Sequence, residues 1–159
     1  MDSLPIFLNV KQRDCLVVGG GQVAARKVAL LAKAGSAITV IAPELCDDLA
    51  EMVAANTISH IAREFEDADI SNQAIIIAST DDRIVNQRIS AIAQEKGIPV
   101  NVVDNPDLCS FLMPSIIDRN PVQIAVSTGG ASPAAPNSPL HVTWSTSLTT
   151  PKLGILRFD

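Results

Sequence analysis

Short apolar runs alternate with amphipathic stretches over the first two thirds of the chain. The runs are rich in Ile and Val and predict buried strands; they lie at residues 15–18, 37–41, 58–62, 74–78 and 99–103. Between them, apolar residues recur at spacings of three and four, which predicts helices over 22–34 and 44–55 and a third that ends at Gly97. This alternation predicts an α/β fold, a Rossmann-like parallel sheet with helices on both faces.

The same spacing predicts which helical residues face the core. In the first helix these are Val23, Leu30, Leu31 and Ala34, with Lys27 in the same series; in the second, Leu45, Leu49, Met52 and Val53; in the third, Ile84, Val85, Ile89, Ile92 and Ala93. Thr80 or Asp81 precedes the third helix and is expected to cap it.

The pattern changes after residue 110. Two apolar stretches, 110–117 and 121–127, are joined by Asp118-Arg119-Asn120, which predicts an antiparallel β-hairpin outside the parallel sheet. We therefore place a boundary near residue 112, between a Rossmann-like domain (1–112) and a second segment (113–159). Residues 131–150 are rich in Ser, Thr and Pro and predict an irregular extension.

Three consecutive glycines, Gly19, Gly20 and Gly21, separate the first predicted strand from the first helix. Gly19-x-Gly21-x-x-Ala24 matches the dinucleotide-binding pattern G-x-G-x-x-G/A in the required strand–turn–helix context. The first glycine permits a tight turn, the second lets the backbone approach a pyrophosphate, and Ala24 lets the helix lie close to the sheet. The stretch predicts NAD binding, with a purely structural turn as the alternative.

Polar residues follow other strands at the edge where ligands bind in such sheets. No carboxylate ends the second strand, although Glu44 follows shortly after and either holds a ribose, which favours NAD over NADP, or marks the start of a helix. Thr80 and Asp81 follow the fourth strand and either contact the ligand or serve as caps. Asp104 follows the fifth strand, "VNVV", and is a candidate general base or metal ligand, or a turn former in "DNPD".

Composition narrows the classes of protein. The net charge of −5 argues against a nucleic-acid partner, and no apolar run is long enough to cross a membrane. Three dispersed cysteines without a CxxC pair, and a start that lacks signal-peptide character, predict a cytoplasmic protein. With two histidines, ligand spacing predicts no metal site.

These segments together resemble the N-terminal module of sirohaem synthase, the precorrin-2 dehydrogenase and sirohydrochlorin ferrochelatase family. The resemblance is carried by "CLVVGGGQVAARKVALLAKAG", "TVIAPE", "ASTDDRIVNQRIS" and, most specifically, "NVVDNPDLCSFLMPSIIDRNPVQIAVSTGGASP", and it runs from about Met1 to Pro133. It implies NAD-dependent oxidation of precorrin-2 to sirohydrochlorin, then Fe2+ insertion to give sirohaem, with Asp104 implicated in both reactions.

The resemblance also implies binding residues and assembly. Adenosine and ribose contacts map onto Gln22, Val23, Pro43 and Glu44, and homodimers form through the segment that begins "SFLMPSIIDR". A serine that is phosphorylated in some members corresponds to Thr128, with Ser127 beside it. Because the tetrapyrrole substrate is rich in carboxylates, candidate contacts, or otherwise solvated surface charges, are Arg83, Arg88 and Arg119.

The chain departs from the family pattern after Pro133. Where a helix is expected it reads "AAPNSPLHVTWSTSLTT", and it becomes family-like again at residues 151–158, which suggests a local frame shift that resequencing would test. The helical domain that usually follows is not in this sequence, so we expect NAD binding with poor or no turnover. The alternatives are a non-catalytic NAD-binding sensor and, less well supported because there is no tyrosine, an ordinary dehydrogenase of small alcohols or acids.

Overall fold

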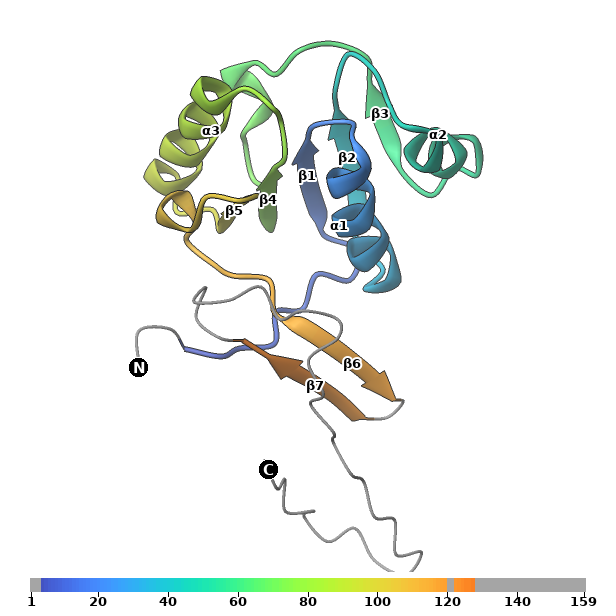
Figure 1. Ribbon diagram of the computed structural model, residues 1–159, viewed down its shortest axis with the longest axis vertical. Coiled ribbons are helices and arrows are strands. Elements are labelled where there is room, and N and C mark those ends of the chain that lie inside the picture. Colours follow the sequence, from blue (N-terminus) through green and yellow to red (C-terminus); the bar gives the residue numbers. More distant parts are fainter. Residues whose placement is uncertain (1–3, 120–121, 128–159) are drawn as a thin grey trace, which may run out of the picture.

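A five-stranded parallel sheet forms the centre of the molecule (Figure 1). The computed structural model describes residues 4–119 and 122–127, so Thr128 and the atypical segment 134–150 lie outside the described residues. The strands are β1 (Asp14–Val18), β2 (Ala37–Ile41), β3 (Ser59–Ile61), β4 (Ile75–Ala78) and β5 (Val100–Val102), and the sheet order is β3-β2-β1-β4-β5. The helices are α1 (Gln22–Lys33), α2 (Asp47–Ala54) and α3 (Arg83–Glu95). The predicted Rossmann-like fold is confirmed.

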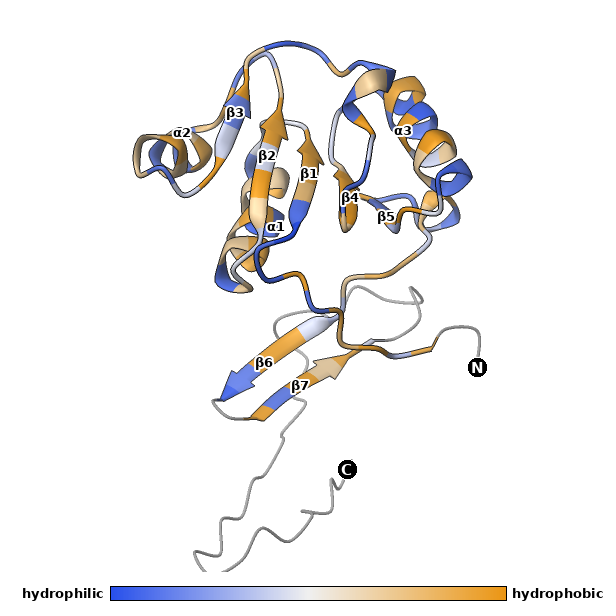
Figure 2. Ribbon diagram, turned by 180° about the vertical axis from the view of Figure 1, so that it is seen from behind, coloured by the Kyte–Doolittle hydropathy of each residue, from blue (hydrophilic) through white to orange (hydrophobic). Residues whose placement is uncertain are grey.

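The central strands of the sheet are buried on both faces. Alternate residues of β1 point to opposite sides: Cys15 and Val17 belong to the core beneath α1 and α2, whereas Leu16 and Val18 belong to the core beneath α3. All four residues of β4 are buried, which explains its unbroken apolar sequence. In Figure 2, β2, β4 and most of β1 are orange, whereas α3 alternates orange and blue, as expected of a helix with one solvent-exposed face.

The predicted core faces of α1 and α3 were wrong in part. Val23 and Leu30 are 39% and 38% exposed, and the buried residues of α1 are Ala24, Ala25, Val28 and Leu31. Small side chains let α1 lie close to the sheet, so alanines occupy the face that a search for large apolar residues passes over. In α3, Ile84 is 75% exposed, and the buried residues are Asn86, Ile89, Ser90 and Ala93.

The predicted starts of α2 and α3 also require correction. Helix α2 begins at Asp47 after the N-cap Cys46, not at Glu44. Helix α3 is capped by Asp82, not by Thr80 or Asp81: its Oδ1 accepts from the amides of Ile84 at 2.8 Å and Val85 at 3.2 Å. A cap must precede the first helical residue directly, and this geometry selects the second aspartate.

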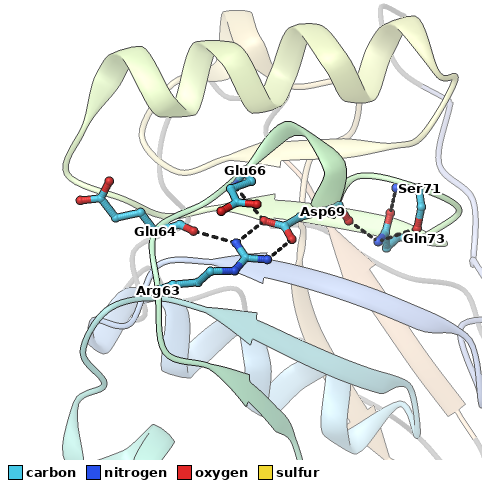
Figure 3. Close-up of polar contacts among 6 residues, drawn as sticks. All are labelled: Arg63, Glu64, Glu66, Asp69, Ser71 and Gln73. Carbon is cyan, nitrogen blue, oxygen red and sulfur yellow. Dashed lines mark hydrogen bonds and ion pairs between the residues drawn. The ribbon is translucent and has the colours of Figure 1, made fainter.

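The crossover from β3 to β4 contains no α-helix. Its one helical turn, η1 (Asp67–Asp69), is fastened by Arg63, which donates to both carboxylate oxygens of Asp69 at 2.5 and 2.9 Å (Figure 3). The Glu66 amide also donates to Asp69 at 2.8 Å. Arg63 lowers the pKa of Asp69 below its usual value, against an opposing effect of burial. These bonds fix an otherwise irregular segment, whose Ile70 is fully buried beneath α3.

The predicted hairpin is present. Strands β6 (Ser115–Arg119) and β7 (Val122–Val126) pair antiparallel, apart from the parallel sheet (Figure 1). Lys33 at the end of α1 forms a 2.8 Å ion pair with Asp118 of β6, and this bridge lowers the pKa of Asp118. Strand β6 continues through Arg119, so two of the three residues assigned to the connection belong to the strand. The domain boundary near residue 112 stays a prediction.

Candidate functional site

Four parallel strands end at one edge of the sheet, and their ends are joined by backbone hydrogen bonds. The amide of Gly19 donates to the carbonyl of Ile41 at 2.9 Å. In the same way the amide of Ser79 donates to the carbonyl of Val18 at 2.8 Å, and the amide of Val103 donates to the carbonyl of Ala78 at 2.9 Å. The strand order reverses direction between β1 and β4. In open parallel sheets, ligands bind at the carboxyl ends of the strands beside this reversal. The predicted residues after β1, β2, β4 and β5 are thus brought to one edge.

Gly19 and Gly20 are required by the protein's own packing. Gly19 has φ of +122°, and a Cβ there would lie 2.2 Å from the carbonyl oxygen of Ser79. A Cβ on Gly20 would lie 1.9 Å from the carbonyl oxygen of Glu44. The Cys46 amide also donates to the Gly20 carbonyl at 2.8 Å. The segment after β2 therefore lies directly against the turn after β1.

Gly21 has a different environment. Within the described residues nothing lies within 4 Å of a Cβ built on it, and its φ of −85° suits any residue. It is the N-cap of α1, where no described side chain provides a capping hydrogen bond and the first turn contains no acidic residue. Behind it, Ala24 is fully buried against the sheet.

The start of α1 is therefore an open backbone surface suited to an anion. The first amides of a helix lack intrahelical partners and carry partial positive charge, so they attract phosphate. The open space at Gly21 allows a pyrophosphate to reach them, and Gln22 and Val23 are exposed on this first turn. The residues present thus fit the dinucleotide that the motif predicts.

Pro43 and Glu44 are exposed in the connection after β2. The acidic residues in the first turn of α2 are Asp47 and Asp48, so the alternative that Glu44 starts this helix is wrong. The contact of the Glu44 backbone with Gly20 brings this connection beside the glycine turn. Its carboxylate is available at the edge where a ribose would lie, although its role as a contact stays a prediction.

Thr80 is held by Asn86, a residue that sequence reasoning missed. Thr80 Oγ1 donates to Asn86 Oδ1 at 2.8 Å, and Asn86 Nδ2 donates to the Thr80 carbonyl at 2.8 Å. Asn86 is 8% exposed, so these bonds are shielded from water. Thr80 therefore shapes the loop after β4, while Asp81 is exposed beside it. The sequence contained one signal for this role: Asn86 is a polar residue on the same helical face as the buried Ile89 and Ala93 of α3.

Asp104 occupies a tight turn directly after β5. The amide of Asn105 donates to the carbonyl of Val102 at 3.3 Å, and Asp104 has φ of +58°. This is the left-handed region, which glycine and asparagine adopt most readily. Its side chain is exposed. The turn-former interpretation is thus correct locally, and the candidate role of Asp104 as a general base stays a prediction.

The three arginines do not form one cluster. Arg88 forms a 2.6 Å ion pair with Asp67, and Arg119 donates to the backbone of Asp118 at 3.2 Å at the far end of β6. Arg83 begins α3 and so lies at the carboxyl edge. In the described part of the chain no group of three or more His, Cys, Asp or Glu residues could hold a metal ion. No helix among the described residues is long and apolar enough to span a membrane.

The parallel sheet and its open glycine turn define a Rossmann-type dinucleotide-binding domain. A family model described as "Putative NAD(P)-binding" matches residues 6–115, and the chain belongs to this family. The expected cofactor, NAD, is thereby confirmed at the level of the family, as an NAD(P) dinucleotide.

Comparison with known proteins confirms the resemblance. The chain is 54% identical over 133 residues to the siroheme synthase of Thioalkalivibrio sulfidiphilus and 54% over 137 residues to that of Nitrosospira multiformis. Each match covers 84% of this chain, but 27% and 29% of the relatives, so the chain spans less than a third of their length. A solved structure, "SirC, precorrin-2 dehydrogenase", has a TM-score of 0.67 at 28% identity and covers 82% of this chain and 64% of its own.

Proposed function

We propose that the chain is an NAD-dependent dehydrogenase module that oxidises precorrin-2 to sirohydrochlorin. The observation that carries the proposal is the shared edge: the open backbone at Gly21 and the exposed Asp104 both lie at the carboxyl ends of the strands. The similarity to siroheme synthases and to a precorrin-2 dehydrogenase supplies the substrate class, a tetrapyrrole.

The oxidation removes one hydride and one proton from the tetrapyrrole. NAD+ supplies the hydride acceptor when it is bound. The Gly21 backbone and the first amides of α1 hold the pyrophosphate, with Gln22, Val23, Pro43 and Glu44 beside the adenosine and ribose. Asp104 takes the proton, for which an exposed carboxylate beside the cofactor is suited. Thr80 and Asp81 border the same site from the loop after β4.

NAD is preferred over NADP in this proposal because of local charge. Glu44 follows β2, and Asp47 and Asp48 start α2 close by. Carboxylates repel the additional phosphate of NADP, and a ribose hydroxyl can donate to one of them. Binding titrations of Glu44→Gln with both dinucleotides test this, since the substitution should narrow the difference in affinity by weakening NAD or strengthening NADP. An unchanged ratio would contradict the assignment.

Iron insertion is the second reaction of the proposal. Fe2+ is a substrate here, and Asp104 first holds the incoming metal transiently. The two pyrrole protons that the metal displaces then pass in turn through this exposed carboxylate to water. A single exposed carboxylate binds Fe2+ weakly, which suits an ion that must leave for the macrocycle. Arg83 is the arginine best placed to attract the carboxylates of the substrate.

The hairpin is proposed as the element through which two copies of the chain form a dimer. The protein is proposed to act in the cytoplasm. An isolated two-stranded hairpin is marginally stable in water, and Ile116 on β6 is 48% exposed. Ile6 and Phe7 add exposed apolar surface at 71% and 74%. A second copy of the chain would cover such residues. Sedimentation equilibrium should give a dimer that Ile116→Asp dissociates; a monomeric wild-type chain would overturn the proposal.

A non-catalytic NAD-binding sensor is the alternative, because a glycine turn that binds a dinucleotide serves a sensor as well as an enzyme. Single-turnover oxidation of precorrin-2, with the protein in excess, distinguishes the enzyme from the sensor. The enzyme should produce sirohydrochlorin and NADH in equal amounts, and Asp104→Asn should slow the step by about 10²-fold or more while NAD+ binding is kept. Asparagine tolerates the positive φ, so this variant controls for the backbone. NAD+ binding without any NADH would favour the sensor.

A further inference from the structure

The turn that carries Asp104 is closed by a side chain from further along the chain. The Sγ atom of Cys109 accepts a hydrogen bond from the Val102 amide at 3.1 Å. The same sulfur lies within donor distance of two carbonyl oxygens, at 3.3 Å from Val102 and 3.3 Å from Asn105. Val102 and Asn105 are the first and last residues of the turn, so one thiol contacts both sides of the segment that holds Asp104.

The thiol is itself held in place. Asn101, 7% exposed on β5, points its Nδ2 at the sulfur at 3.6 Å and donates to the carbonyl of Phe111 at 3.1 Å. On either side of Cys109, Ser90 Oγ donates to the Leu108 carbonyl at 2.7 Å, and the Val100 amide donates to Ser110 Oγ at 2.8 Å. The segment is therefore tied to both β5 and α3.

The ionisation state of the thiol suits this contact. Burial raises the pKa of Cys109, while the Val102 amide and the positive charge of Lys27 on α1 oppose that change. The group therefore stays protonated at neutral pH, and it can donate to a carbonyl while it accepts from an amide.

We propose that Cys109 is a positioning residue for Asp104: its thiol closes the turn and fixes where the carboxylate stands. The inference rests on the proposed function, since it matters for catalysis only if Asp104 takes the substrate proton. A base misplaced by a fraction of an ångström loses rate without losing cofactor affinity, because the dinucleotide is held by the glycine turn. Loss of the thiol should therefore reduce the rate of oxidation and leave NAD+ binding unchanged.

Two substitutions separate positioning from simple packing. Cys109→Ser keeps a group that donates and accepts, whereas Cys109→Val fills similar space without a hydrogen bond. Under the inference, the serine variant keeps the single-turnover rate and the valine variant loses it by about tenfold. If Cys109 serves only to fill space, the two variants should differ in thermal stability and not in rate. Cys15→Val is the matched control, because Cys15 is buried and its sulfur contacts the Arg13 carbonyl and not this turn.

A second measurement, amide hydrogen exchange, tests the closure of the turn without any need for turnover. Amide hydrogen exchange at Val102 and Asn105 should quicken in Cys109→Val and Cys109→Ala, but not in Cys109→Ser or Cys15→Val. A double variant provides a further test of rate. If Cys109 acts through Asp104, then in the Asp104→Asn variant the additional replacement Cys109→Val should cause no further loss of the single-turnover rate.

The outcomes distinguish the two claims. Equal rates and equal exchange in Cys109→Val and wild type would overturn the inference and leave the proposed function intact. A wild-type chain that forms no NADH, with exchange that still depends on the thiol, would overturn the proposed function and leave the closure of the turn standing. Normal rates with quickened exchange would show that the thiol fixes the turn without a catalytic effect, and would overturn the positioning role.

Discussion

Gly20 and Gly21, which follow β1, should respond differently to substitution by alanine. An alanine at Gly20 would place its Cβ 1.9 Å from the Glu44 carbonyl oxygen, which must move by about 1.5 Å to reach ordinary van der Waals contact. Such overpacking should cost about 2–3 kcal/mol and lower Tm by about 10 °C. At Gly21 the space around the Cβ is open among the described residues and φ is −85°, so alanine should change stability by less than about 0.5 kcal/mol.

The affinity for the dinucleotide should be reduced by the Gly21 substitution, although that substitution has little effect on stability. The Cβ of Gly21→Ala enters the space through which a pyrophosphate reaches the backbone, so the Kd for NAD+ should rise at least about tenfold, or about 1.4 kcal/mol. Gly97→Ala is the control: it has φ of +67° in open space, and it should lose about 1 kcal/mol of stability and no affinity. Urea denaturation and isothermal titration calorimetry measure the two quantities. A Gly21→Ala chain that binds NAD+ as tightly as wild type would refute the placement of the pyrophosphate.

Three further substitutions test other parts of the structure. Asp104→Gly should stabilise the fold by about 1 kcal/mol in urea denaturation, because glycine adopts the positive φ without strain; a less stable variant would contradict this. Asn86→Leu should destabilise by about 1–3 kcal/mol, since it leaves the half-buried polar groups of Thr80 without their partner, and unchanged stability would refute that role. The folded-state pKa of Asp69 lies below its unfolded value of 3.8, so its stabilising effect is present above that pH and is lost as pH falls through the folded value. Stability measured from pH 6 downward should fall less steeply in Arg63→Met than in wild type, and parallel curves would contradict the assignment.

The strands could be predicted closely from the sequence because strands buried on both faces leave a continuous apolar signal. The runs at 37–41 and 74–78 became β2 and β4 with the same ends to within one residue. The helix faces could not be predicted as well. Helix α1 packs through Ala24 and Ala25, and alanine contributes little to a search for large apolar residues. The G-x-G-x-x-A pattern predicted the close approach at Ala24, but Ala25 and Val28 on the same buried face lie outside that pattern.

Gly19, Gly21 and Asp104 were chosen from their spacing and from their position after a strand, and their roles in binding and catalysis stay predictions. The packing reason for Gly20 has no such local signal, because it depends on the backbone of Glu44, which is adjacent only after folding. Cys109 was missed for the same reason. Its sulfur contacts Val102 and Asn105 only because η2 (Pro106–Leu108) returns the chain towards β5. Contacts between segments that are separate in sequence have no local signature.

A structure of the chain with bound NAD+ would show whether the glycine turn and Asp104 serve one site. The pyrophosphate should lie against the Gly21 backbone and the first turn of α1, with the nicotinamide ring on the side of the sheet edge that carries Asp104. A dinucleotide bound away from Gly21, or a nicotinamide ring on the opposite side from Asp104, would contradict this arrangement.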